Sequence, residues 1–217
     1  MKQTRKKWAL TTKLSLAIVA TGLLPALIIG GLALRTANQT AGDVGKTLEA
    51  SAVNLADTIE RNLFERYGDV QAFTLNEAVF DRSSWYHIGS ESNRISAVAN
   101  RYANLYGCYP LSYVVDLEGR LVAVNDKDPT GKAIDTVSLY QKNFKEEAWF
   151  QAAVAGQFTK SGSLDGTYLE DLRVDVDLKK VYGGEGLSLG FTALIKDSSG
   201  KSVGVWRNVA IECLGAV

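Results

Sequence analysis

The sequence has few of the side chains that bind metals or work in nucleophile–base pairs. Its 217 residues include one histidine, His87, and two cysteines, Cys108 and Cys213. One histidine and two distant cysteines do not complete a zinc site or a histidine-based catalytic constellation. There is no G-x-S-x-G nucleophile elbow, and the acid pair Glu146-Glu147 is typical of a solvated helix start. We expect no catalytic residues, no metal and no cofactor, which argues against a hydrolase.

The sequence also lacks an excess of charge of either sign, because 24 basic residues balance 24 acidic ones. The basic excess lies at the amino terminus, so the rest of the chain is mildly acidic and predicts no nucleic-acid partner. Two cysteines are too few for a disulfide scaffold. Cys108 and Cys213 either form one bridge in an oxidising compartment or stay as two buried thiols.

A single long apolar run is present. The 21 residues 14–34 carry no charge, and Lys2, Arg5, Lys6, Lys7 and Lys13 precede them without an acidic residue. A helix needs about 20 apolar residues to cross a bilayer core of about 30 Å. Positive charge on one flank holds that flank in the cytoplasm. We predict a cytoplasmic tail over 1–13, a transmembrane helix over 14–34 and a periplasmic remainder, in a single-pass protein of the cell inner membrane.

The alternative for this start is a cleaved secretory signal. Such a signal has an apolar region of about 7 to 15 residues and a small-x-small cleavage site. Here the run is longer, and Leu32, Ala33, Leu34 and Arg35 at its exit give no A-x-A pattern. Both interpretations export the chain from residue 36 onward.

A long stalk helix is predicted over 36–80. Apolar residues recur there in steps of three and four, while acidic and basic residues occupy the opposite side. The stripe consists of Val44, Leu48, Ala52, Leu55, Ile59, Leu63, Val70 and Phe73. A helix this long needs packing partners. We expect one part of it to pack on its own domain and the part near the membrane to pack on a second copy of the helix. We therefore expect a homodimer through the stalk; the alternative is packing within one subunit.

Residues 81–211 predict a module with an antiparallel sheet and helices on one face, so the whole chain is α+β. The expected helices cover 93–106, stopped by Gly107, and 146–155, ended by Gly156. Period-two patterns predict strands over 111–115, 121–124, 168–176, 187–195 and 203–211. Two of the turns share the pattern Asp-x-x-Gly. This order of elements is that of a PAS-like sensor module.

Three stretches carry a family resemblance: Val114-Val115-Asp116-Leu117-Glu118-Gly119, Ala148-Trp149-Phe150-Gln151-Ala152-Ala153, and the run 193–208. With the anchor and stalk before them, they resemble the amino-terminal part of a bacterial methyl-accepting chemotaxis receptor with an extracytoplasmic Cache (PAS-like) sensor domain. The resemblance implies the ligand-sensing part of a membrane chemoreceptor, which acts in signal transduction and is not an enzyme. The alternative is the sensor of a membrane histidine kinase or diguanylate cyclase.

The chain also departs from that family. Its members commonly carry two stacked modules, a second membrane helix and a cytoplasmic signalling region. This chain has no second apolar run of 18 or more residues and stops at Val217. We therefore expect either a receptor fragment or a truncated gene product, whose truncated end is 212–217.

The resemblance also implies a ligand pocket. Amino-acid-binding members begin the pocket helix with Arg-x-Trp-Tyr, whose arginine grips a carboxylate. Here Trp149 and Phe150 match the aromatic pair, but Glu147 stands in the arginine's place. Asp171, which follows Tyr168, and Asp197 match the aspartates that bind an amine. The expected ligand-binding residues are Tyr113, Tyr140, Glu147, Trp149, Phe150, Tyr168, Asp171 and Asp197.

Taken singly, these residues also have plain structural explanations. Trp149 and Phe150 suit a core, and Asp197 suits an Asp-x-x-Gly turn. Taken together, the aromatic and acidic side chains suit an ammonium group through cation–π and ion-pair attraction. We expect a small-molecule ligand that is cationic or neutral.

Overall fold

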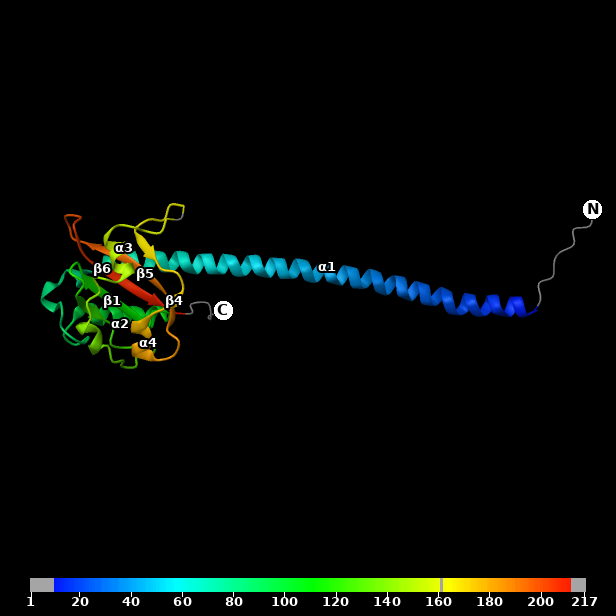
Figure 1. Cartoon of the computed structure of the whole chain (residues 1–217), viewed down its shortest axis with the longest axis horizontal. Helices are drawn as coiled ribbons and strands as arrows, with labels where there is room; N and C mark the ends of the chain where they lie inside the picture. The colour runs from blue at the N-terminus through cyan, green and yellow to red at the C-terminus, as the bar shows by residue number, and fades with distance from the viewer. Residues whose placement is uncertain (1–9, 161, 212–217) are drawn as a thin grey trace, which may run out of the picture. The chain divides into compact units, whose positions relative to one another are not determined.

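The computed structural model describes residues 10–160 and 162–211. The chain divides into two units, Met1–Thr58 and Ile59–Val217, and helix α1 (Leu10–Thr74) contributes to both (Figure 1). In the first unit every described residue is helical, and all of them except the half-buried Thr58 are exposed. Among the described residues α1 is the one helix long and apolar enough to cross a membrane, with a mean hydropathy of 2.2 over its most apolar window. Pro25 lies inside it without ending it.

Helix α1 ends at Thr74, short of the predicted Phe80. Beyond it, Asn76 caps the short 3₁₀ helix η1 (Glu77–Phe80), because its side-chain oxygen accepts a hydrogen bond from Ala78 N at 3.0 Å. A second 3₁₀ helix, η2 (Arg82–Ser84), follows. An asparagine side chain that bonds its own backbone two residues on favours a cap over a helix interior, which explains the early end.

Six antiparallel strands form one sheet: β1 (Leu111–Asp116), β2 (Leu121–Val124), β3 (Thr167–Leu169), β4 (Arg173–Val174), β5 (Leu187–Lys196) and β6 (Ser202–Ala210). The order is β2-β1-β6-β5-β3, and β4 pairs with β5. Both predicted hairpins, β1–β2 and β5–β6, are confirmed. In each turn an aspartate, Asp116 or Asp197, accepts two backbone hydrogen bonds.

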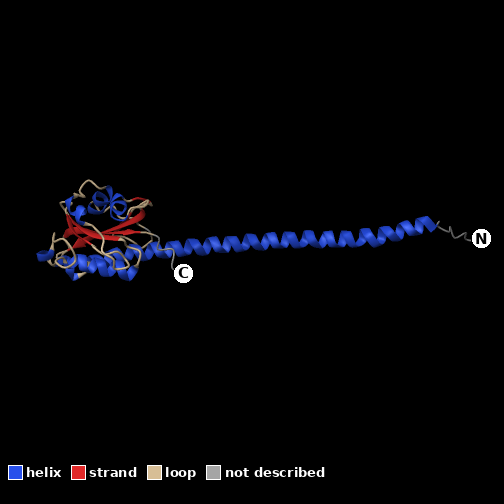
Figure 2. Ribbon diagram, turned by 90° about the horizontal axis from the view of Figure 1, so that it is seen from below, coloured by secondary structure: helices blue, strands red, loops and turns tan. Residues whose placement is uncertain are grey.

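Helices cover both faces of this sheet, although the sequence predicted one (Figure 2). The end of α1 and helix α2 (Arg94–Tyr106) pack on the first, here called the α1/α2 face. The 3₁₀ helix η3 (Val137–Gln141), α3 (Ala148–Val154) and α4 (Val176–Tyr182) cover the second, the α3/α4 face. Every residue of β1 is buried, and a strand buried on both sides needs cover on both.

Helix α4 replaces part of a predicted strand. The segment 168–176 holds the end of β3 and the two residues of β4, and α4 begins at Val176. Asp175 starts the helix, because its side chain accepts a hydrogen bond from Leu178 N at 2.9 Å. Gly183, with φ +74°, ends it. The alternation of apolar residues masked this capping signal.

The cysteine prediction concerns a residue outside the described part. Cys108 is buried, and its Sγ accepts a hydrogen bond from Arg66 Nη1 at 3.0 Å. Cys213 lies outside the described residues. Both alternatives for the two thiols therefore stay predictions.

Candidate functional site

A row of side chains crosses the sheet on the α3/α4 face. Arg207 of β6 pairs with Tyr113 of β1 on one side and with Thr192 of β5 on the other, and Thr192 pairs with Tyr168 of β3. Directly opposed residues of antiparallel strands point to the same face of a sheet. The strand register thus brings together residues that lie far apart in the chain.

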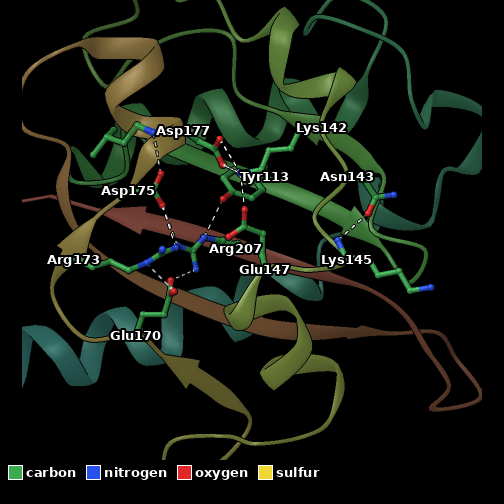
Figure 3. A network of polar contacts seen from close by, with 11 residues as sticks. Tyr113, Lys142, Asn143, Lys145, Glu147, Glu170, Arg173, Asp175, Asp177 and Arg207 are labelled. Carbon is green, nitrogen blue, oxygen red and sulfur yellow. Dashed lines mark hydrogen bonds and ion pairs between the residues drawn. The ribbon is translucent and has the colours of Figure 1, made fainter.

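Arg207 lies at the centre of this row and is only 1% exposed. Its Nε donates to Tyr113 Oη at 3.0 Å, and its Nη2 donates to Asp175 Oδ2 at 3.1 Å (Figure 3). Nη1 pairs with the carboxylate of Glu170. The guanidinium carbon stands 4.5 Å from the centre of the Trp149 ring. We call Tyr113, Trp149, Glu170 and Asp175 the cage.

The charges of the cage explain why a buried arginine is tolerated. Burial alone lowers the pKa of Arg207, but Tyr113 and the carboxylates of Glu170 and Asp175 more than offset this, and the pKa is raised above its usual value. Burial, the largest cause, raises the pKa of Tyr113, so its hydroxyl stays protonated. Arg173, on the outer side, pairs with Glu170 at 2.9 Å.

A second ion cluster adjoins the cage on the same face. Lys142 Nζ lies 2.8 Å from Asp177 and 2.8 Å from Glu147 (Figure 3). Burial lowers the pKa of Lys142, but hydrogen bonds to Asp177 and Glu147 outweigh it and raise the pKa. Around the cage, three cations (Arg207, Arg173 and Lys142) therefore face four carboxylates (Glu170, Asp175, Asp177 and Glu147).

Short helices and ring contacts hold the cage residues in place. Trp149 is in the first turn of α3, and its ring centre lies 6.0 Å from that of Tyr113 and 5.8 Å from that of Phe144. Asp175 combines two roles, since one oxygen caps α4 and the other accepts from Arg207. The aromatic wall and the acidic wall thus come from different elements on one face.

The expected ligand-binding residues fall into two groups. Tyr113 and Trp149 are cage residues. Glu147 lies next to the cage, where its carboxylate pairs with Lys142. Phe150 packs edge-on against Trp149, with ring centres 5.8 Å apart. Tyr168 stands at the end of the sheet row. These five residues share the α3/α4 face.

The remaining three form no hydrogen bond, ion pair or ring contact with the cage in the described structure, although Tyr140 packs on the same face as part of η3. Asp171 is exposed. Asp197 stays in the β5–β6 turn, where the hydroxyl of Ser199 and the backbone N–H groups of Ser199 and Lys201 lower the pKa of its carboxyl. Tyr140 lines a surface pocket of about 430 Å³ together with Tyr86 and Arg120. The structure does not bring Asp171, Asp197 or Tyr140 to the cage.

Sequence reasoning missed the charged residues that complete the site: Arg207, Glu170, Asp175, Asp177 and Lys142. Arg207 had a detectable signal, because it stands at an inward position of the alternating strand Val203–Ile211, where a charge requires a partner. Glu170 and Asp175 had none, since their approach to Arg207 depends on how the strands pair.

An apolar groove of about 550 Å³ lies apart from this site. Leu63, Leu172, Leu189, Phe191 and Ile211 are among the side chains that line it. Among the described residues that line it, none is acidic and Arg66 is the one with a charge. The cage offers both charge and aromatic surface, which are what hold a small polar molecule in place, so we take the cage as the candidate site.

No protein-family model and no curated protein matches this sequence. Solved structures do match. The sensory domain of the Campylobacter jejuni chemoreceptor Tlp3 with isoleucine bound is 14% identical, with a TM-score of 0.50, over 72% of this chain and 54% of that one. The chain has the fold of a chemoreceptor sensory domain. The Tlp3 ligand-binding domain in complex with L-valine gives the same identity and TM-score and 55% coverage of its own length.

The sensor domain of the Vibrio cholerae histidine kinase DctB matches less closely. It is 12% identical, with a TM-score of 0.48, over 72% of this chain and 52% of that one. This chain therefore spans about half the length of the solved structures it matches. The fold of this chain is α+β, as predicted from the sequence.

Proposed function

We propose that this chain is the ligand-sensing part of a membrane chemoreceptor. In this proposal α1 anchors it in the inner membrane, the unit that begins at Ile59 lies on the periplasmic side, and a small molecule binds at the cage. The apolar run in α1, its one-sided positive flank and the fold support the proposal. Solved structures with this fold hold isoleucine or L-valine.

The observation that carries the proposal is the buried, charge-rich cage. Burying ion pairs is costly, and well-packed apolar residues often stabilise a fold as well or better. Charged groups that are nevertheless buried against aromatic rings are candidates for a binding site. In this chain they lie under α3 and α4, on a face where an apolar core would suffice for stability.

The charge balance of the site indicates the class of ligand. Three cations face four carboxylates, so the cluster carries one negative charge in excess. Glu147, where a carboxylate-binding arginine would stand, pairs with Lys142 instead. The excess negative charge would repel an anion at this site, and no arginine stands at position 147 to bind its carboxylate. We infer that the ligand is cationic or neutral.

A thermal-shift screen of the full chain in detergent tests this proposal. We expect an amine or a neutral polar compound to raise the melting temperature and simple organic acids to leave it unchanged. A ligand at 100 times its Kd adds about 2.7 kcal/mol of stability.

Two matched variants locate the binding. Trp149→Leu removes the aromatic wall and should abolish the shift relative to its own baseline. Trp85→Leu makes the same change in a buried tryptophan of the α1/α2 face and should keep it. A shift lost equally in both variants, or none with any compound, would contradict the proposal.

A further inference from the structure

Arg207 fills the space that a ligand's cationic group would take. Its guanidinium lies over the face of Trp149, is only 1% exposed, and meets Tyr113, Asp175 and Glu170 at its three nitrogens. Aromatic faces and carboxylates together are how proteins hold guanidinium and ammonium groups. The site therefore already contains the kind of group that it is built to bind.

Three walls of the cage are held by elements of their own, while Glu170 is also paired with Arg173 on its outer side. Tyr113 is fixed in β1, Trp149 in α3 and Asp175 at the start of α4, where it also caps the helix. Gly190 of β5 leaves room beside them, since a Cβ there would lie 2.5 Å from Arg207 Nη1 and closer still to Glu170. Removing the arginine side chain would leave a preformed cavity with two carboxylates.

One polar atom beside the cage is buried without a partner in the described structure. Arg207 Nη1 and Glu170 pair with each other, and Arg173 Nε pairs with Glu170 at 2.9 Å. Thr192 Oγ1, which lies beside Arg207 in the sheet register, makes no hydrogen bond. Buried polar atoms without partners are rare in proteins. A molecule that takes the place of the arginine side chain would lie next to this hydroxyl.

We propose that the cage is a site for guanidinium and ammonium groups, and that Arg207 is a tethered occupant which a cationic ligand replaces. This inference rests on the proposed function in placing the ligand at the cage. Without Arg207 the surrounding cluster would hold two cations against four carboxylates. This excess of negative charge would strongly favour the binding of a small cation over the Trp149 ring.

Chemical rescue of Arg207→Ala in the full chain tests the inference, with ethylguanidinium as the probe. We expect the variant to melt below the wild type and the probe, at 100 times its Kd, to raise that melting temperature by about 5 °C or more. Wild-type protein should respond only at a much higher concentration of the probe, because the probe must there displace Arg207 from the cage. Urea, which has a similar shape without charge, should not rescue.

Two further variants separate the cage from a general effect. Arg94→Ala removes an arginine that is exposed and pairs only with Asp81, so the probe should leave it unchanged. Glu170→Gln in the Arg207→Ala background should weaken the rescue several-fold. If Arg207→Ala does not fold unaided, refolding with the probe should recover native protein and refolding with urea should not.

Failure of this inference is distinguishable from failure of the proposed function. Absence of rescue in both melting and refolding would overturn the cation cage, even if the wild type binds another ligand. Rescue without any ligand for the wild type would support the cage and contradict sensing.

Discussion

At the scale of single residues, Gly190 determines whether the cage can form. Its backbone lies under the Arg207–Glu170 pair, and a Cβ would come within 2.5 Å of Arg207 Nη1 and 2.7 Å of Nη2. These side-chain ends are buried and held by other contacts, so they cannot move aside freely. The absence of a side chain at this position is therefore a requirement of the buried ion pair.

Gly190→Ala should lower the free energy of unfolding by about 1–3 kcal/mol, the usual cost of overpacking. Chemical denaturation of the full chain in detergent measures this. In a background carrying Glu170→Ala and Arg207→Ala the cost should shrink, because the obstructing atoms are gone. Gly68→Ala is the control, since nothing lies within 4 Å of that helical position and alanine should be neutral or stabilising. Equal losses at both glycines would count against this explanation.

At the scale of elements, Asn93 joins helix α2 to the sheet. Its side-chain oxygen accepts from Ile95 N at 3.0 Å and Ser96 N at 3.2 Å, which caps the helix. Its side-chain nitrogen donates to His87 O and Val122 O, both at 2.9 Å. One buried amide thus satisfies the start of a helix and the carbonyl of a strand residue.

Asn93→Ala should destabilise the protein by about 2 kcal/mol, since a lost cap costs about 1 kcal/mol and the loss of the two donated hydrogen bonds adds to it. Asn93→Ser retains a capping oxygen but not the two donated bonds, so its loss should be smaller but not zero. Denaturant titration of the two variants gives the comparison. Full recovery by serine would mean that capping is the whole effect.

The apolar stripe of α1 is predicted to pair with the same stripe of a second copy. Leu48 and Leu55, on the apolar stripe, are 65% and 58% exposed within the chain, so a second copy of α1 can cover them. With Cys108 and Cys213 replaced, cysteines at Leu48 and Leu55 should cross-link readily in membranes. Cysteines at Glu49 and Glu60, on the opposite side, should not. Uniform cross-linking, or none, would favour packing within one subunit.

Elements with local signals were predictable from sequence. Helix α2 carries its cap at Asn93 and its stop at Gly107, and each hairpin turn carries its own Asp-x-x-Gly. The contacts that bring the charged side chains to the cage carry no local signal. Tyr113 and Arg207 are 94 positions apart, and Asp175 is 32 from Arg207, so strand pairing alone brings them together. The aromatic wall was found through a short motif at Trp149, whereas the charged wall depends on long-range register.

At the scale of the whole molecule, the account requires the unit from Ile59 onward to lie outside the cytoplasm. A reporter enzyme that is active only outside the cytoplasm should work when fused after residue 100 and fail when fused after residue 13. The positive flank at residues 2–13 is the physical reason. Activity of a cytoplasmic reporter fused after residue 100 would overturn the topology.

The central claim is that the cage binds a small cationic or neutral molecule. Calorimetry of the full chain in detergent tests it most directly, with matched ligands such as butylamine and butyrate, repeated on Asp171→Ala and Glu147→Arg. We predict that the wild type prefers the amine and that Glu147→Arg, which adds a cation beside Lys142, shifts the preference toward the acid. Asp171 is exposed and makes no hydrogen bond or ion pair with the cage residues, so its replacement should change little. Tight binding of butyrate by the wild type, unaffected by either variant, would contradict the account.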